Sequence, residues 1–237
     1  MEINFPILVI NLDSQEDRWK SCVQQAEKYG LSLTRIPAVT PDKLPFDSIH
    51  YVADGVRAVW QSHLACFRFL ESTGARYALI LEDDYKIRDA KKLSYYLNDP
   101  KVLQYDLVQF GFLKPGVDTR VKVLIANVET RIFKLLSYFS QLPIISNSKL
   151  PQRLRVRESK DLPQGFTADD FQPGAHCYLI SRNLAKVVPE LNDPQFLSID
   201  DFFTAFSQMR SYKFIRVRRS LVDQAPFAKW QGDRFLS

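Results

Sequence analysis

Short apolar runs alternate with segments of helical periodicity along the first 110 residues, and this alternation restricts the fold more than any other feature. The runs that predict buried strands span residues 6–10, 34–39, 77–81 and 106–110. Amphipathic segments separate them, and the longest begins near Asp54 and ends at Gly74. Strands that alternate with helices are typical of layered α/β folds with parallel neighbouring strands. We therefore predict an α/β fold with a mostly parallel central sheet.

The pattern breaks between residues 115 and 163 and then resumes, with a predicted strand at 175–180. We predict a single domain over residues 1–237, in which 115–163 form an irregular insertion. A predicted helix over 130–139 has an apolar face, and basic residues follow it. Such a combination is typical of peripheral contact with an anionic membrane surface. The alternative is that the apolar face packs on the sheet.

The overall charge and the cysteine and glycine content exclude several classes of protein. The formal net charge is +5 and the pI about 9.0, an excess too small to indicate a nucleic-acid partner. The eight glycines form neither a GxGxxG nor a Walker-A loop. Three widely spaced cysteines predict free buried thiols in a reducing compartment. Since we find no signal peptide or membrane span, we expect a cytoplasmic protein.

The sharpest chemical feature is a row of three carboxylates, Glu82-Asp83-Asp84, directly after a predicted strand. In open α/β sheets, ligands bind beyond the carboxyl ends of strands. Residues two apart in an extended chain face the same way, so Glu82 and Asp84 are predicted to share one face. There they could hold a hard divalent cation that also binds phosphate oxygens. The alternative is a solvated acidic turn in which Asp83 or Asp84 caps a helix.

Four further residues are candidates with an ordinary structural alternative. His63 lies on the apolar stripe of its predicted helix, where a core histidine satisfied by one hydrogen bond is the alternative to catalysis. Asp200 and Asp201 begin a predicted helix, and acids there complement the helix dipole. Arg18, one turn into the first predicted helix, either contacts donor or acceptor charge or is an exposed helix arginine.

Five segments occur in an order and spacing that are more specific together than any one of them alone. They are Val9-Ile10-Asn11-Leu12-Asp13 with Arg18, Ser62-His63-Leu64, residues 77–84 with their Leu-Glu-Asp-Asp end, residues 174–181 (GAHCYLIS) and Ile199-Asp200. Together they resemble glycosyltransferase family 25, which includes bacterial lipooligosaccharide galactosyltransferases and collagen galactosyltransferases. The resemblance covers residues 6–90 and 173–205.

The resemblance implies a GT-A-like fold, an inverting mechanism and a UDP-sugar donor, most simply UDP-galactose. It implies that Mn²⁺ (or Mg²⁺) is held by the acidic motif, where Glu82 and Asp84 are the expected ligands. Asp200 is then the expected catalytic base, with Asp201 as the alternative. The residues expected to bind the donor are Asn11, Arg18, Asp83 and His63. The expected acceptor is a glycan or a lipid-linked glycan, as in lipopolysaccharide biosynthesis, with the enzyme in the cytoplasm or at the inner face of a membrane.

Two alternative functions stay open at the level of sequence. Asp84-Tyr85-Lys86 has the acid-x-Lys form found in a class of metal-dependent nucleases, and the basic pI suits a phosphate polymer. A non-catalytic carbohydrate-binding relative of the GT-A fold is the other alternative. Release of free nucleotide from a panel of nucleotide sugars with Mn²⁺ would distinguish the transferase from both.

Overall fold

The computed structural model describes residues 3–44, 52–113, 162–168, 170–193, 195–207 and 212–225. All of them lie in one compact unit that comprises Met1–Leu113 and Ser159–Ser237. The predicted insertion lies outside the described residues except for positions 162 and 163, and so do its predicted apolar helix and basic cluster.

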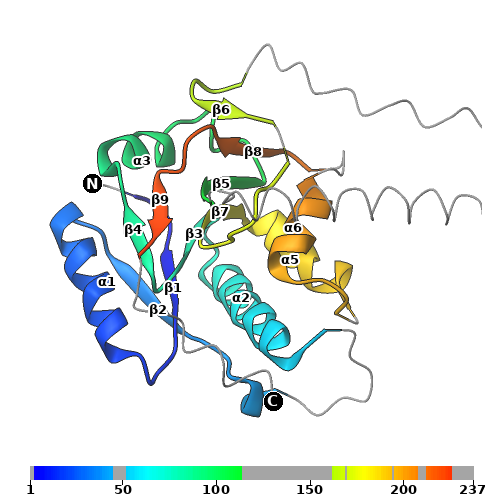
Figure 1. Ribbon diagram of the computed structural model, residues 1–237. Coiled ribbons are helices and arrows are strands. Elements are labelled where there is room, and N and C mark those ends of the chain that lie inside the picture. The colour runs from blue at the N-terminus through cyan, green and yellow to red at the C-terminus, as the bar shows by residue number, and fades with distance from the viewer. Residues whose placement is uncertain are drawn as a thin grey trace, which may run out of the picture. The chain divides into compact units, whose positions relative to one another are not determined.

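Within the described ranges, seven strands form one sheet in the order β2-β1-β3-β7-β5-β8-β6 (Figure 1). Their bounds are β1 (Ile7–Asn11), β2 (Leu33–Pro37), β3 (Tyr77–Glu82), β5 (Leu107–Gly111), β6 (Phe166–Thr167), β7 (Cys177–Ser181) and β8 (Phe214–Val217). A second, two-stranded sheet pairs β4 (Tyr85–Ile87) with β9 (Val222–Gln224). The helices are α1 (Glu16–Tyr29), α2 (Asp54–Thr73), α3 (Ala90–Leu97), α5 (Arg182–Leu191) and α6 (Ile199–Ser207), with a 3₁₀ turn η1 (Pro41–Lys43).

The direction of the strands confirms the predicted α/β fold, with two strands of the large sheet reversed. β1 runs parallel to β2 and β3, and β5 runs parallel to β8. β7 is antiparallel to both of its neighbours, β3 and β5, and β6 is antiparallel to β8. Among the described strands, five therefore share one direction, and β7 and β6 oppose it. An antiparallel strand can begin at the end of the sheet where its neighbour finished. A parallel strand needs a crossover connection back to the opposite end.

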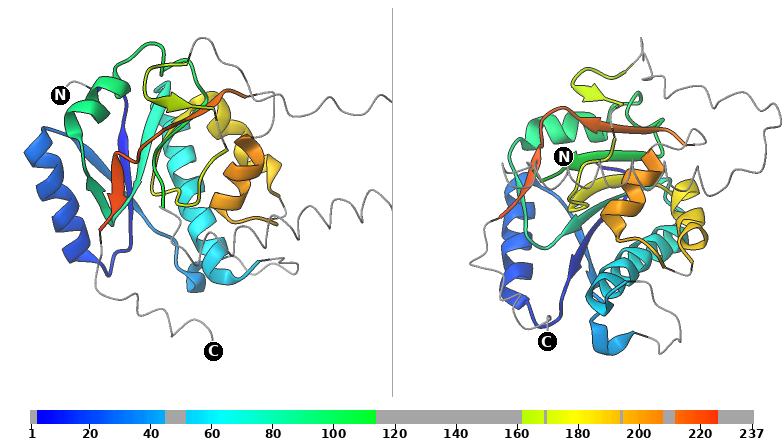
Figure 2. Two further views of the ribbon diagram at one scale, coloured as in Figure 1. Left: turned by 45° about the horizontal axis from the view of Figure 1, so that its top comes forward. Right: turned by 45° about the vertical axis from the view of Figure 1, so that its right-hand side comes forward.

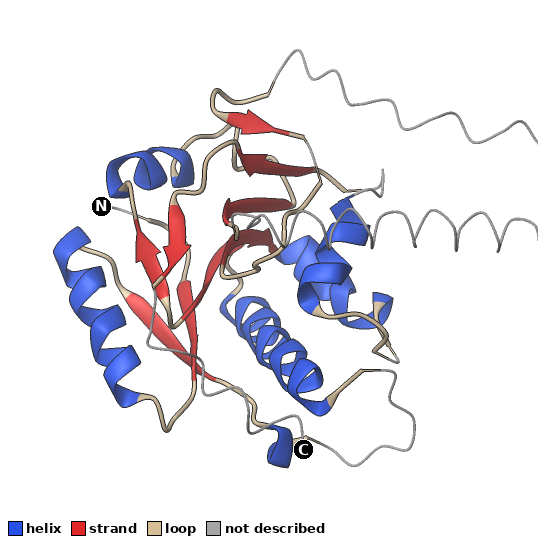
Figure 3. Cartoon of the chain, viewed as in Figure 1, coloured by secondary structure: helices blue, strands red, loops and turns tan. Residues whose placement is uncertain are grey.

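Helices cover both faces of the large sheet, and each face has its own apolar core (Figure 3). Ala78 and Ile80 of β3 face a core that includes residues of α2, α5 and α6. Leu79 and Leu81 face the opposite core, to which α1, α3 and the β4–β9 pair contribute (Figure 2). The alternation of side chains along a strand accounts for this division. With both faces covered by apolar packing, polar side chains from several strands meet at the strand ends.

The strand ends that carry the candidate site residues lie together at one edge of the sheet. β1, β3, β5 and β8 all finish at this edge because they share a direction, and the reversed β7 begins there. The residues at this edge come from segments far apart in the sequence, from Asn11 to residues beyond 220.

Two further observations concern the cysteines and the lengths of the helices. Cys22, Cys66 and Cys177 are buried and unpaired, as predicted. None of the described helices is long and apolar enough to cross a membrane.

Candidate active site

The acidic motif stands at the end of β3, near the middle of the sheet, as the sequence predicted. β3 ends at Glu82, and Asp83 and Asp84 form the turn into β4. The alternation expected of Glu82 and Asp84 therefore does not apply, because the extended conformation stops before Asp84. Three elements hold the backbone of the turn. The Glu82 N–H donates to the His176 carbonyl at 3.1 Å, the Cys22 thiol donates to the Asp83 carbonyl at 3.2 Å, and the Ala225 N–H donates to the Asp84 carbonyl.

Asp83 is the buried centre of a network that faces α1. Its Oδ2 accepts a hydrogen bond from Asn11 Nδ2 at 2.7 Å, and its Oδ1 accepts one from Arg18 Nη1 at 3.0 Å. Arg35 Nε donates to Asn11 Oδ1 at 2.9 Å. Since a guanidinium can only donate, Arg35 fixes the Asn11 amide with its nitrogen toward Asp83. The structure thus brings together three of the four residues expected to bind the donor, and both carboxylate oxygens of Asp83 are occupied within the protein.

Asp84, the next residue, has the opposite environment. Its Oδ1 is buried and has no hydrogen-bond partner among the described residues. Burial, followed by the negative charges of Glu82 and Asp83, raises the pKa of Asp84 to about 7, and Arg18 opposes this only in part. A carboxylate oxygen that is buried without a hydrogen-bond donor destabilises the fold when the group is ionised. A proton or a bound cation would remove that cost.

Glu82 has polar neighbours on the other side of the turn. Gln224 Nε2 donates to its Oε2 at 3.3 Å, and His63 Nε2 lies 3.8 Å from its Oε1. Burial alone would raise the pKa of Glu82, but the hydrogen bond and charge of His63, followed by His176 and Gln224, lower it below its ordinary value. Glu82 is therefore ionised at neutral pH.

His63 fits the structural alternative of the sequence analysis and also lies at the site. It is buried on α2, and its Nδ1 is 2.7 Å from the Tyr178 hydroxyl. Its other nitrogen faces Glu82. His63 therefore lies on the Glu82 side of the turn, while Asn11 and Arg18 lie on the Asp83 side.

His176 is a site residue that the sequence analysis did not name as a candidate. It is completely buried, and its Nε2 lies 3.0 Å from the Val222 carbonyl, so Nε2 carries the proton. Its Nδ1 is buried and finds no partner in the described part of the chain. Gly111 and Gly174 make room for the ring, because a Cβ on either would come within 3.0 Å of a ring nitrogen. The one signal in the sequence was its place in the GAHCYLIS segment, directly before a strand.

The two candidate bases have different surroundings. Asp200 accepts hydrogen bonds from the Gly174 N–H at 3.0 Å and the Ala175 N–H at 2.7 Å, which holds it beside the beginning of β7. Burial raises the pKa of Asp200, and these two N–H groups offset only part of that rise. Asp201 is exposed and forms a reciprocal cap with Ser198: Ser198 Oγ donates to Asp201 Oδ2 at 2.6 Å and accepts from the Asp201 N–H. The assignment of the catalytic base stays a prediction.

The carboxylates of the site could act as ligands of a cation that a substrate also binds. In the described residues, no group of three or more His, Cys, Asp or Glu side chains is arranged to hold a metal ion. Both oxygens of Asp83 accept short hydrogen bonds, whereas Glu82 has a longer hydrogen bond from Gln224 and the more distant His63, and Asp84 Oδ1 has no partner among the described residues. Glu82 and Asp84 are therefore the carboxylates that could hold a cation. Two carboxylates can suffice where substrate phosphates complete the coordination.

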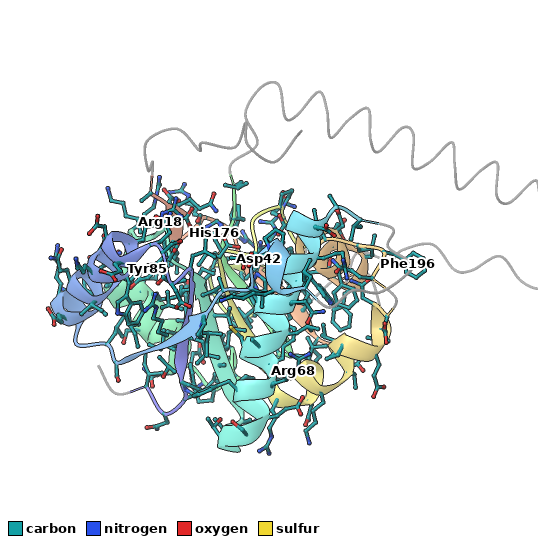
Figure 4. The ribbon with its side chains drawn as sticks, turned by 90° about the horizontal axis from the view of Figure 1, so that it is seen from below. Arg18, Asp42, Arg68, Tyr85, His176 and Phe196 are labelled. Carbon is teal, nitrogen blue, oxygen red and sulfur yellow. The ribbon has the colours of Figure 1, made fainter. Side chains whose placement is uncertain are left out.

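Side chains from distant segments reach this edge of the sheet. Figure 4 labels Arg18 of α1 and His176 before β7 at the same end of the sheet, whereas Arg68 of α2 lies away from it. The site therefore combines residues from β1, α1, α2, the β3–β4 turn, the beginning of β7, α6 and β9.

Two of the solved structures that are similar to this chain show how weak the likeness is. One is a glycosyltransferase involved in the glycosylation of the major capsid of PBCV-1, with 11% identity, coverage of 95% of this chain and 94% of that chain, and a TM-score of 0.44. The other is described as a glucose-1-phosphate thymidylyltransferase from Bacillus anthracis in complex with a sucrose, with 12% identity, coverage of 92% and 70%, and a TM-score of 0.39. Likenesses at these scores carry no argument. No curated protein matches the chain significantly in sequence.

A family model gives the decisive comparison. The model described as glycosyltransferase family 25 (LPS biosynthesis protein) matches residues 4–203. The matched range includes Asn11, His63, the acidic motif and Asp200, whereas β8 and β9 lie beyond it. The chain belongs to glycosyltransferase family 25.

Proposed function

We propose that this protein is an inverting glycosyltransferase that transfers galactose from UDP-galactose to a hydroxyl group of a glycan acceptor. Family membership supports glycosyl transfer and disfavours the nuclease alternative. The observation that carries the proposal for the donor and the metal is the buried, unpartnered Oδ1 of Asp84, beside the carboxylates of Glu82 and Asp83. Arg18 neutralises the charge of Asp83 and Asn11 donates a hydrogen bond to it, whereas Asp84 Oδ1 has no partner among the described residues.

Glu82 and Asp84 would hold Mn²⁺ or Mg²⁺. Their chemistry fits, because hard cations prefer carboxylate oxygens and commonly bind through one or two carboxylates together with substrate phosphates. When bound, the ion supplies a Lewis acid that neutralises negative charge on the leaving diphosphate. Both oxygens of Asp83 already accept hydrogen bonds, so Asp83 supports the site by fixing the turn.

The remaining residues of the site position the reactants. The Asn11–Asp83–Arg18 network would hold the turn in place beside the bound donor, and His63 would orient Glu82. Asp200 would accept the proton of the attacking acceptor hydroxyl, since inversion needs a carboxylate on the face opposite the leaving group. Its raised pKa brings it closer to neutral pH, which favours general-base catalysis. The peptide N–H groups of Gly174 and Ala175 would hold this carboxylate in place.

A panel of nucleotide sugars tests the proposal. The full chain is incubated with each donor in Mn²⁺ or in EDTA, and free nucleotide is measured. We expect UDP release from UDP-galactose with Mn²⁺, faster than from other donors, and little release in EDTA. Cleavage of labelled DNA without nucleotide release from any sugar would contradict the proposal. The cytoplasmic location, the membrane contact and the lipid-linked acceptor stay predictions from the sequence.

A further inference from the structure

A cavity of about 220 Å³ opens between α3, the chain just before β6 and the connection from β8 to β9. These three segments lie side by side in Figures 1 and 2. The lining includes the basic residues Lys92, Arg218 and Arg219 and no acidic residue. Tyr96, Val217 and Leu221 supply its apolar surface. The cavity thus combines an apolar wall with three positive charges.

These charges have little compensation within the protein. None of the three basic side chains forms an ion pair with an acid of the described ranges. Lys92 Nζ lies 5.8 Å from the centroid of the Tyr96 ring. Asp89, at the N-cap of α3, uses its Oδ1 to accept a hydrogen bond from the backbone N–H of Lys92. Like charges gathered around a concave surface repel one another, so an anion in the cavity would stabilise them.

Local contacts fix the wall of the cavity. Gly165 has a φ of +89°, and a Cβ there would clash with the Tyr96 hydroxyl, which donates to the Gln164 carbonyl at 2.9 Å. Arg218 is anchored twice to the neighbouring chain, because its backbone N–H donates to the Gly165 carbonyl at 2.9 Å and its Nε to the Phe166 carbonyl at 3.0 Å. The guanidinium of Arg218 therefore has a defined position before any ligand binds.

The cavity lies at the same edge of the sheet as the candidate active site. β8 ends at Val217, and its carboxyl end shares this edge with that of β3. Three strand spacings separate β8 from β3, or about 14 Å at the usual spacing of 4.7–4.9 Å. Leu221 lines the cavity, and the next residue, Val222, accepts the hydrogen bond of His176. A ligand in the cavity would therefore lie beside the candidate active site, and one extended substrate could contact both.

We propose that this cavity binds an anionic substituent, a phosphate or a carboxylate, on a sugar of the acceptor glycan. The assignment to the acceptor rests on the proposed transferase function. Arginine binds both anions through paired N–H groups, and the apolar surface of Tyr96, Val217 and Leu221 suits the face of a sugar ring. The confined volume favours a single charged sugar over the backbone of a long polyanion.

Titration of the full chain with glucose 6-phosphate, glucuronate and glucose, followed by NMR, tests the inference. We expect glucose 6-phosphate or glucuronate to bind at least about tenfold more tightly than glucose, and the stronger of the two identifies the anion. The double substitution Lys92→Gln with Arg219→Gln should weaken that binding by at least about tenfold. Lys91→Gln is the matched control, because Lys91 is the exposed neighbour of Lys92 on α3 and does not line the cavity.

Three results would overturn the inference. They are the absence of binding by either anion, equal affinity for glucose, and unchanged anion affinity in the double variant. A titration with UDP and Mn²⁺ separates this inference from the proposed function. The double variant should bind UDP as the wild type does, and loss of UDP binding would make the cavity part of the donor site instead. Failure of the nucleotide-sugar panel with intact anion binding would reject the transferase and leave an anion site.

Discussion

Two neighbouring carboxylates on the two flanks of the β3–β4 turn, Asp83 and Asp84, differ in their hydrogen bonding. On the α1 flank, both oxygens of Asp83 accept hydrogen bonds, from Asn11 and Arg18. The other flank, defined here by Asp84 and by His176 before β7, contains two buried atoms, Asp84 Oδ1 and His176 Nδ1, that have no partner in the described ranges. Buried polar atoms are paired in most proteins, so unpaired ones need an explanation. We interpret the first flank as one that stabilises the turn, and we propose that the second binds a ligand.

Asp84→Asn should break the ligand-binding flank with the largest effect on activity. The substitution removes one negative charge from the expected metal site and preserves the shape of the side chain. We expect UDP release from UDP-galactose to fall about 10³-fold, which corresponds to about 4 kcal/mol in the barrier. Initial rates measure this, with Asp17→Asn as the control because its carboxylate is fully exposed on α1. A rate for Asp84→Asn near that of the control would contradict the assignment.

Asp200→Asn tests the proposed base, because it should separate UDP binding from the rate of transfer. An amide retains an acceptor oxygen for only one of the two N–H groups, that of Gly174 or that of Ala175, and it cannot act as a base. We expect unchanged UDP affinity and a transfer rate lower by about 10²-fold. Asp201→Asn, which weakens the Ser198 cap of α6, should leave the rate nearly unchanged. If Asp201→Asn instead shows the hundredfold loss, the base is Asp201.

Asp83→Asn tests the stabilising flank through the free energy of unfolding. The new NH₂ group would face a donor, Asn11 Nδ2 or Arg18 Nη1, and the hydrogen bond from that donor to residue 83 would be lost. We expect the variant to lose about 2–3 kcal/mol of stability in urea unfolding monitored by circular dichroism. Asp17→Asn should change stability by less than about 0.5 kcal/mol. Equal stability of the two variants would show that the network contributes nothing to the fold.

The pH dependence of stability gives the smallest expected effect. The pKa of Asp84 is raised from 3.8 to about 7 in the folded state, so its contribution to stability is full below pH 4 and is lost as the pH rises through 7. In EDTA, Asp84→Asn should therefore become more stable relative to the wild type between pH 5 and pH 8, by on the order of 1 kcal/mol. Thermal unfolding at each pH measures the difference. A difference in stability that stays constant with pH would contradict the raised pKa of Asp84.

Periodicity in the sequence predicted the layered α/β fold and the place of the acidic motif, because both follow from local patterns. The direction of β7 could not be predicted, since an apolar run such as Cys177–Ser181 has the same composition in either direction. The contrast between Asp83 and Asp84 was also hidden. The two residues are chemically identical, and their difference depends on how α1 packs against the turn.

The partners of the acidic motif escaped prediction for a related reason. Gln224, Val222 and Arg35 reach the site or its network through tertiary contacts between segments that share no motif. His176 was within a recognised segment, but its role depends on two glycines, Gly111 and Gly174, that approach the ring from separate parts of the chain. Such an approach leaves no mark at a fixed spacing in the sequence.

Isothermal titration of UDP tests most directly whether the unpartnered flank is a cation-dependent donor site. Wild type and Asp84→Asn are each titrated in Mn²⁺ and in EDTA. The account predicts that Mn²⁺ strengthens UDP binding to the wild type by at least about tenfold and has no effect on the variant. Equal UDP affinity of the wild type in Mn²⁺ and EDTA, or full Mn²⁺ enhancement in Asp84→Asn, would contradict it.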